Sequence, residues 1–167
     1  MKKIILILII TLSFNNSLGQ IFHRKNNQDR LVILSPGFST QGNGNYYTEI
    51  NFMYAKLESG GPCTPPALYG PRIGLETNFN NNHLVYAPKI GWEGSSFLFG
   101  IRGSIISYID QGQIDLRFLP EIGISLLSGV NLFYGYNIPL RDFRTTATTK
   151  HRLTLTINLD FDLWSDF

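Results

Sequence analysis

The sequence HRLTLTINLDFDL, residues 151–163, decides how this chain folds, because from Arg152 on polar and apolar side chains alternate along it without a break. The apolar residues are Leu153, Leu155, Ile157, Leu159, Phe161 and Leu163, and the polar residues between them are Arg152, Thr154, Thr156, Asn158, Asp160 and Asp162. This period of two residues predicts a β-strand whose two faces meet different surroundings.

The same period recurs along the chain, whereas no stretch of useful length has the period of a helix. It predicts eight strands, at residues 31–40, 46–57, 69–79, 84–93, 96–108, 113–126, 129–139 and 151–163. Turn-forming sequences such as QGNGN, NNN, EGSS and DQG separate them. The first segment is the least regular, since it contains Pro36, which suits only a sheet edge or a bulge.

Strands with two unlike faces fit a soluble lipocalin-like barrel, which turns its apolar face inward, or a membrane barrel, which turns it toward lipid. Eight strands enclose a space that side chains just fill, too small for the many large apolar residues here. The polar face instead contains glycines that leave room in a narrow lumen: Gly74, Gly91, Gly100, Gly123 and Gly135. Aromatic residues near the segment ends match the girdles of a membrane barrel: Tyr46, Tyr54, Tyr69, Phe79, Trp92, Phe97, Tyr108 and Phe161. We therefore expect an all-β, transmembrane, antiparallel up-and-down barrel of eight strands, with the soluble barrel as the alternative.

Residues 1–19 have the layout of a cleaved secretory signal peptide, with Lys2 and Lys3 before a short apolar run. Residues 20–30 follow as a polar leader, and residues 31–167 form the barrel. The chain has 14 Lys plus Arg and 12 Asp plus Glu, so losing Lys2 and Lys3 balances the charges. No basic face for nucleic acid is expected. Cys63, the single cysteine, cannot form an internal disulfide.

With its signal peptide and its ending FDLWSDF, the chain resembles small eight-stranded outer-membrane β-barrel proteins of the OmpX/OmpA-barrel type. The stretches YGPRIGLE, YAPKIGWE, LRFLPEIGISL and NLFYGYNIPL also resemble barrel proteins of Bacteroidota-type bacteria. The resemblance implies a C-terminal signal for the barrel-assembly machinery, formed here by Leu159, Phe161, Leu163 and Phe167; Ser165 departs from its apolar pattern. It also implies that both chain ends are periplasmic, and that residues 41–45, 80–82, 109–112 and 140–150 face outward.

Charged residues lie on the polar faces of the central segments, and a narrow lumen would force them to pair. The expected lumen charge network comprises Arg72, Glu76, Lys89, Glu93, Arg102, Asp115, Arg117 and Glu121. We expect salt bridges around Arg102 and Arg117 to close the lumen. The alternative is that the charges line a conduction path for small solutes.

The outward segment 140–150 and its flank are basic, with Arg141, Arg144, Lys150 and Arg152. This outer basic patch could contact anionic lipopolysaccharide or a partner, although a solvated loop would have the same composition.

Catalytic and metal-binding patterns are not expected in this chain. His23, His83 and His151 fall in different segments, and no Gly-x-Ser-x-Gly sequence occurs. We therefore expect no enzyme activity, cofactor or metal, and regard a lipid-modifying enzyme as the least favoured alternative. The expected role is that of an outer-membrane scaffold or an accessory subunit of an envelope complex, with a narrow solute pore as the second possibility.

Overall fold

The computed structural model describes residues 30–42, 44–58, 67–78, 84–96, 98–126, 128–142, 145 and 148–160. These residues form an antiparallel sheet and include no helix long and apolar enough to cross a membrane. The strands are β1 (Arg30–Gln41), β2 (Asn45–Glu58), β3 (Ala67–Asn78), β4 (Val85–Ser96), β5 (Phe99–Asp110), β6 (Gln113–Leu126), β7 (Val130–Tyr136), β8 (Ile138–Pro139), β9 (His151–Ile157) and β10 (Leu159–Asp160).

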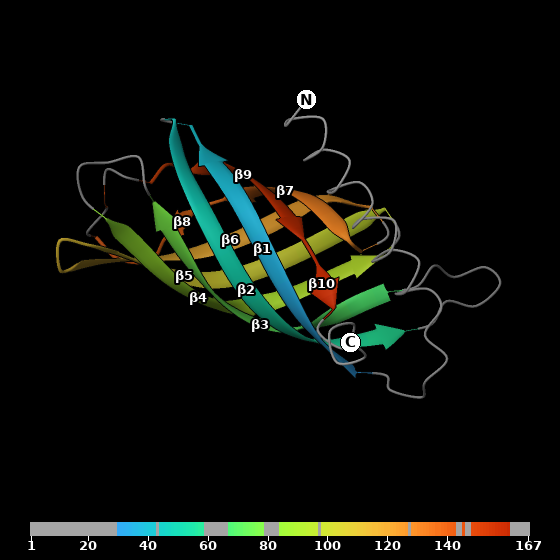
Figure 1. The fold of residues 1–167 in the computed structure, drawn as a ribbon. Coiled ribbons are helices and arrows are strands. Elements are labelled where there is room, and N and C mark those ends of the chain that lie inside the picture. The colour runs from blue at the N-terminus through green and yellow to red at the C-terminus, as the bar shows by residue number, and fades with distance from the viewer. Residues whose placement is uncertain are drawn as a thin grey trace, which may run out of the picture.

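The sheet closes on itself as an eight-stranded up-and-down barrel (Figure 1). Strand β8 continues β7 beyond Asn137, and β10 continues β9 beyond Asn158. The ten labelled strands therefore form eight strands of the barrel, which we call staves. Each stave pairs with the next along the chain, and β1 closes the barrel by pairing with β9 and β10. The predicted all-β, antiparallel, up-and-down barrel of eight strands is therefore confirmed.

The two ends of the barrel differ in what lies there, and we call them the terminal end and the loop end. Strand β1 begins and β10 ends at the terminal end, where Ile33 pairs with Asp160. The β1–β2 and β5–β6 turns and the described residues of the 140–150 connection lie at the loop end (Figure 1). The β5–β6 turn is tight, with φ of 50° at Gln111 and 82° at Gly112. Two successive positive φ values are typical of a two-residue type I′ hairpin.

Four prolines lie in the interior of long strands: Pro36, Pro71, Pro88 and Pro120. Each proline lies between two neighbouring strands, and its strand pairs without interruption with one of them. The pairing with the other strand is interrupted at two positions, one of which is the proline, and it resumes in the same register beyond them. Proline has no N–H to donate to a ladder. The prediction that Pro36 marks an edge or a bulge was wrong: β1 is paired on both sides, and the ladder simply skips the proline.

Side chains alternate between a buried lumen and an exposed outer surface along all the long strands. The outer surface is apolar, with large hydrophobic side chains exposed on every stave. At outward positions of the described strands, Asp, Glu, Lys and Arg occur only at the terminal end, at Arg30, Lys56 and Glu58. Glycines on the lumen side admit close neighbours, since a Cβ on Gly91 would lie 2.3 Å from the Gly103 carbonyl oxygen.

Side chains fill the lumen in three zones along the barrel. The terminal apolar cluster is Leu31, Ile33, Met53, Ala55 and Leu68. The loop-end apolar cluster is Tyr47, Val85, Ala87, Ile106, Tyr108 and Leu119. Tyr108 was predicted to belong to an aromatic girdle, but it is fully buried in the lumen. Charged side chains occupy the zone between these two clusters.

Candidate functional site

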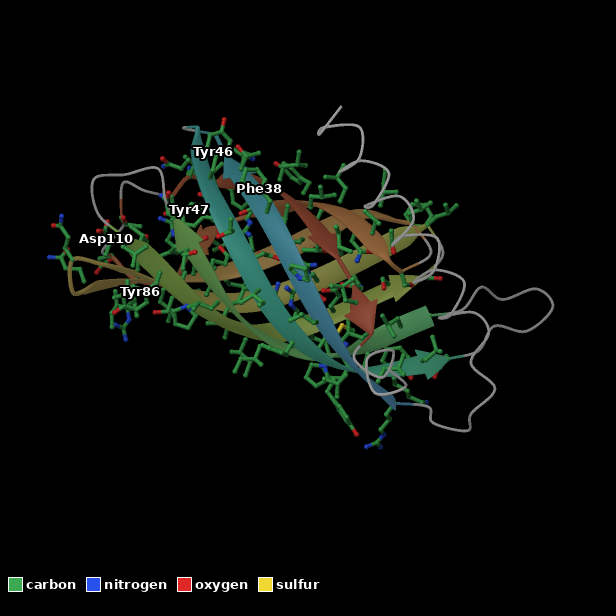
Figure 2. The ribbon with its side chains drawn as sticks, in the orientation of Figure 1. Phe38, Tyr46, Tyr47, Tyr86 and Asp110 are labelled. Carbon is green, nitrogen blue, oxygen red and sulfur yellow. The ribbon has the colours of Figure 1, made fainter. Side chains whose placement is uncertain are left out.

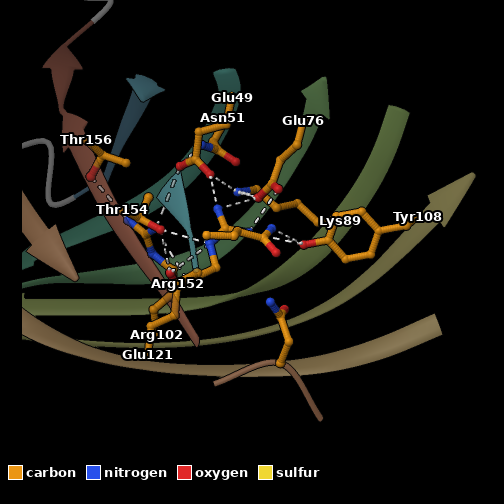
Figure 3. A network of polar contacts seen from close by, with 12 residues as sticks. Glu49, Asn51, Glu76, Lys89, Arg102, Tyr108, Glu121, Arg152, Thr154 and Thr156 are labelled. Atoms are coloured by element: carbon orange, nitrogen blue, oxygen red, sulfur yellow. Dashed lines mark hydrogen bonds and ion pairs between the residues drawn. The ribbon is translucent and has the colours of Figure 1, made fainter. Parts of the chain in front are cut away.

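Eight charged side chains from six staves meet in the middle of the lumen. Figure 3 labels Glu49, Glu76, Lys89, Arg102, Glu121 and Arg152 among them. This central charge network consists of Glu49, Arg72, Glu76, Lys89, Glu93, Arg102, Glu121 and Arg152. None of the eight side chains is more than 1% exposed. Four of the residues are acidic and four basic, so the network is formally neutral. Charges buried this deeply must be paired, because a lone ion out of water costs several kcal/mol.

Glu49 of β2 is the acidic centre of the network. Its carboxylate contacts the Lys89 ammonium and lies 3.1 Å from Arg152 Nη2. The guanidinium groups of Arg72 and Arg102 approach the same carboxylate at 3.7 Å. The alternation of β2 turns Glu49 inward, and because Gly37 of the neighbouring strand has no side chain, the Glu49 side chain can pass close to its backbone. One carboxylate thereby joins cations from β3, β4, β5 and β9.

Arg152 of β9 is the basic counterpart of Glu49. Its Nη1 and Nη2 atoms donate to the two carboxylate oxygens of Glu76, each at 2.9 Å. The Nε atom donates to Thr154 Oγ1 at 2.9 Å, and Nη1 also approaches the Tyr108 hydroxyl at 3.4 Å. Arginine bound at both nitrogens in this way is held in orientation as well as in position. Figure 3 shows Arg152 between Glu76, Tyr108 and Thr154.

Arg102 of β5 connects the network to the terminal side of the lumen. Its Nε donates to Glu93 at 3.0 Å and its Nη2 to Thr156 Oγ1 at 3.2 Å. The guanidinium lies over the Phe133 ring, 4.0 Å from the centroid, a favourable cation–π position. Glu93 also accepts from Arg72 at 2.7 Å. Two arginines, from the strands on either side of β4, therefore share one carboxylate of β4.

The sequence-predicted lumen residues divide into two groups. Six of them, Arg72, Glu76, Lys89, Glu93, Arg102 and Glu121, lie in the central charge network. The other two, Asp115 and Arg117, form their own pair at 2.6 Å near the loop end. Arg117 is thus not a centre of the network, contrary to the prediction, because it sits beyond the loop-end apolar cluster that includes Leu119.

Two members of the network were missed from the sequence. Glu49 was not considered, although it shares the inward parity of Asn51 on β2. Arg152 was assigned to the outer basic patch, and this assignment was wrong, because its side chain is fully buried. The signal was its place in the alternation, on the same face as Thr154, Thr156 and Asn158.

The 140–150 connection is held against the loop end of the lumen at its described residues. Thr145 donates its backbone N–H to Asp115 at 2.8 Å and its hydroxyl to Asp110 at 2.5 Å. Thr149 donates its N–H to Gln41 at 2.8 Å, and its hydroxyl accepts from the Gly42 N–H at 3.0 Å. The described residues of the connection therefore contact β5 and β6 on one side and the end of β1 on the other.

The remaining predicted sites are only partly described. Arg141 and Lys150 are exposed at the loop end, and Leu159 pairs with Leu34. Outside the described residues lie Arg144, Phe161, Leu163, Phe167, His83, Cys63, the signal peptide and the polar leader up to residue 29.

The central charge network is held together by ion pairs and hydrogen bonds. Among the described residues no group of three His, Cys, Asp or Glu side chains could hold a metal ion. His151 lies on the outer surface, where its Nδ1 is 2.6 Å from the Tyr134 hydroxyl and its ring packs edge-on to Tyr136. The network can therefore lock the staves together and fill the lumen.

Comparisons of the chain with protein-family models, with curated proteins and with solved structures found no match.

Proposed function

We propose that this protein is an outer-membrane β-barrel with a structural or interaction role, exported by a cleaved signal peptide. One observation carries the proposal: the barrel exposes large apolar side chains outward and buries charged ones inward. A soluble barrel places these groups the other way round. In lipid, strands must also pair their backbone groups in a closed barrel, as they do here.

The height of the apolar surface supports a membrane belt. On β2, the outward rings of Tyr46 and Tyr54 are separated by eight residues, or about 26 Å at roughly 3.3 Å per residue. A strand tilt of about 40° reduces this to ~20 Å, close to the roughly 25 Å belt of membrane barrels. Phe38 stacks on Tyr46 near the loop end, with centroids 5.6 Å apart (Figure 2). Arg30 and Lys56 lie over Tyr54 and Tyr69 at the terminal end, where cations can reach lipid phosphates.

The filled lumen favours a scaffold over a solute pore. The central charge network is neutral and internally paired, and an apolar cluster lies on each side of it. An ion would have to displace several buried salt bridges to pass. A role as an accessory subunit of an envelope complex, or as a scaffold that presents its loop end outside the cell, is compatible with a closed barrel.

The proposed partners follow from this location. Outer-membrane lipid would cover the apolar belt, and the barrel-assembly machinery would read the C-terminal residues Leu159, Phe161, Leu163 and Phe167. At the loop end, exposed Arg141 and Lys150 could contact the phosphates of lipopolysaccharide. The basic patch is reduced by one cation, since Arg152 points into the lumen.

Fractionation of a Gram-negative host that expresses the full chain tests the proposal. We expect the protein in the outer membrane after density-gradient separation, resistant to carbonate extraction. On electrophoresis in detergent, unheated and boiled samples should migrate differently, because the closed barrel resists unfolding until heated. Release from the periplasm without detergent would overturn the proposal in favour of a soluble barrel.

A further inference from the structure

Near the terminal end of the lumen, two polar side chains from adjacent strands lie side by side. Ser125 of β6 and Asn131 of β7 are directly paired across the ladder, and both side chains are fully buried. Residues paired in this way on one face have Cβ atoms about 4.5–5.5 Å apart. Within the described part of the chain, neither the Ser125 hydroxyl nor the Asn131 carboxamide oxygen or nitrogen has a hydrogen-bond partner.

Asn158 shows that this end of the lumen can satisfy a buried asparagine with protein atoms. Its Oδ1 accepts from the Ser35 hydroxyl at 2.7 Å, and its Nδ2 donates to the Ser128 carbonyl at 2.8 Å. Asn131 has no equivalent bonds, although Thr156 is its direct neighbour on β9. The Thr156 hydroxyl accepts a bond from Arg102 instead.

The surroundings of Asn131 are small as well as polar. The adjoining row of lumen positions contains Ser95, Gly100 and Gly123, paired in succession across β4, β5 and β6. The Ser95 hydroxyl is also buried without a partner in the described structure. Phe133 lies against Gly100, where a Cβ would be 2.8 Å from the ring. The lining therefore combines hydrogen-bonding groups that have no partner in the described structure with short side chains, and the Phe133 ring occupies the space beside Gly100.

The ligand that fits this lining must be small, neutral, and able to donate and accept hydrogen bonds. A buried carboxamide without any partner is strongly unfavourable, and natural proteins fill such positions with internal water. An ion is disfavoured, because the nearby charges already balance. We propose that Ser125 and Asn131 form an internal water-binding site in the terminal third of the lumen, a feature that does not depend on where the barrel resides.

Substitution by leucine, which has nearly the shape of asparagine, tests whether the site is wet. If a water molecule bridges Asn131 and Ser125, Asn131→Leu expels that water and leaves the Ser125 hydroxyl without a hydrogen-bond partner. The urea midpoint of unfolding is then lower than in the wild type. If no water binds the Asn131 carboxamide, the same change removes a buried polar group that has no hydrogen-bond partner, and the urea midpoint of unfolding rises. Asn158→Leu is the matched control, and it should lower the midpoint in either case because it breaks two protein hydrogen bonds.

Nuclear magnetic resonance of the intact, isotope-labelled barrel in detergent micelles gives a direct reading without a variant. We expect rotating-frame Overhauser cross-peaks between water and the Asn131 side-chain amide protons. The Asn158 amide, bonded to a carbonyl, serves as the internal reference and should show none. Absence of the Asn131 cross-peak overturns the proposal, as does a raised midpoint for Asn131→Leu.

Discussion

At the scale of single residues, Arg152 shows how much one buried charge can determine. It contacts Glu49, Glu76 and Glu121, so its removal would leave three carboxylates in the lumen with one cation fewer. Arg152→Met keeps an unbranched, apolar stem in place of the arginine stem and removes the charge. We expect the free energy of unfolding to fall by about 3–5 kcal/mol, the cost typical of breaking a buried ion pair.

Lys150 provides the control for this prediction, because it lies two residues away on the same hairpin but is exposed. Lys150→Met should change the free energy of unfolding by less than about 0.5 kcal/mol. Urea unfolding in lipid vesicles, followed by tryptophan fluorescence, measures both variants. Equal effects of the two changes would place Arg152 outside the lumen.

At the scale of elements, the period-two pattern was sufficient to predict every long strand. Alternation depends only on which face of a strand meets water or apolar groups, so local sequence records it. The prolines were harder to interpret, because whether a missing N–H ends a ladder or leaves a gap depends on the neighbouring strand. Pairs such as Arg72–Glu93 were also beyond sequence reasoning, since they join residues of different strands and require the register.

The sequence did not reveal how the 140–150 connection is held against the barrel mouth. Its described residues bind the barrel mouth through backbone groups, and Gln41 is one of the acceptors, at 2.8 Å from the Thr149 nitrogen. Gln41→Ala removes that bond, so the connection should open more often. We expect trypsin to cleave after Arg141 or Lys150 several-fold faster in this variant.

Gln113→Ala is the matched control for the loop-opening prediction. Gln113 lies at the same end of the barrel, is exposed, and pairs with Asp110 in the tight β5–β6 hairpin. Its replacement should leave the trypsin cleavage rate unchanged, as judged by mass spectrometry of timed digests. Equal acceleration in both variants would mean that Gln41 does not hold the connection.

At the scale of the whole molecule, three properties fit one architecture: the outer surface is apolar, the strands form a closed barrel, and the charged side chains in the lumen balance. Each property was expected from the sequence, but two members of the central charge network were not, because Glu49 and Arg152 come from strands whose inward positions are mostly uncharged. A network that joins six staves also ties the first strands to the last. The closing β1–β9 seam is therefore reinforced inside by the pair between Arg152 and Glu49 of β2.

This arrangement predicts how the barrel behaves toward ions. The wild-type protein in planar lipid bilayers should give no steady conductance steps, because the central charge network blocks the lumen. The double substitution Glu49→Ser with Arg152→Ser keeps the network neutral and removes two of its most connected side chains. We expect small, reproducible conductance steps in that variant, provided that it retains the heat-dependent mobility of a folded barrel.

Lys56→Ser with Glu58→Ser is the charge-matched control on the outer surface, where the two side chains lie 3.2 Å apart, and this variant should show no conductance steps. Steady conductance of the wild type would instead identify the lumen as a pore, because ions would then pass without loss of the network.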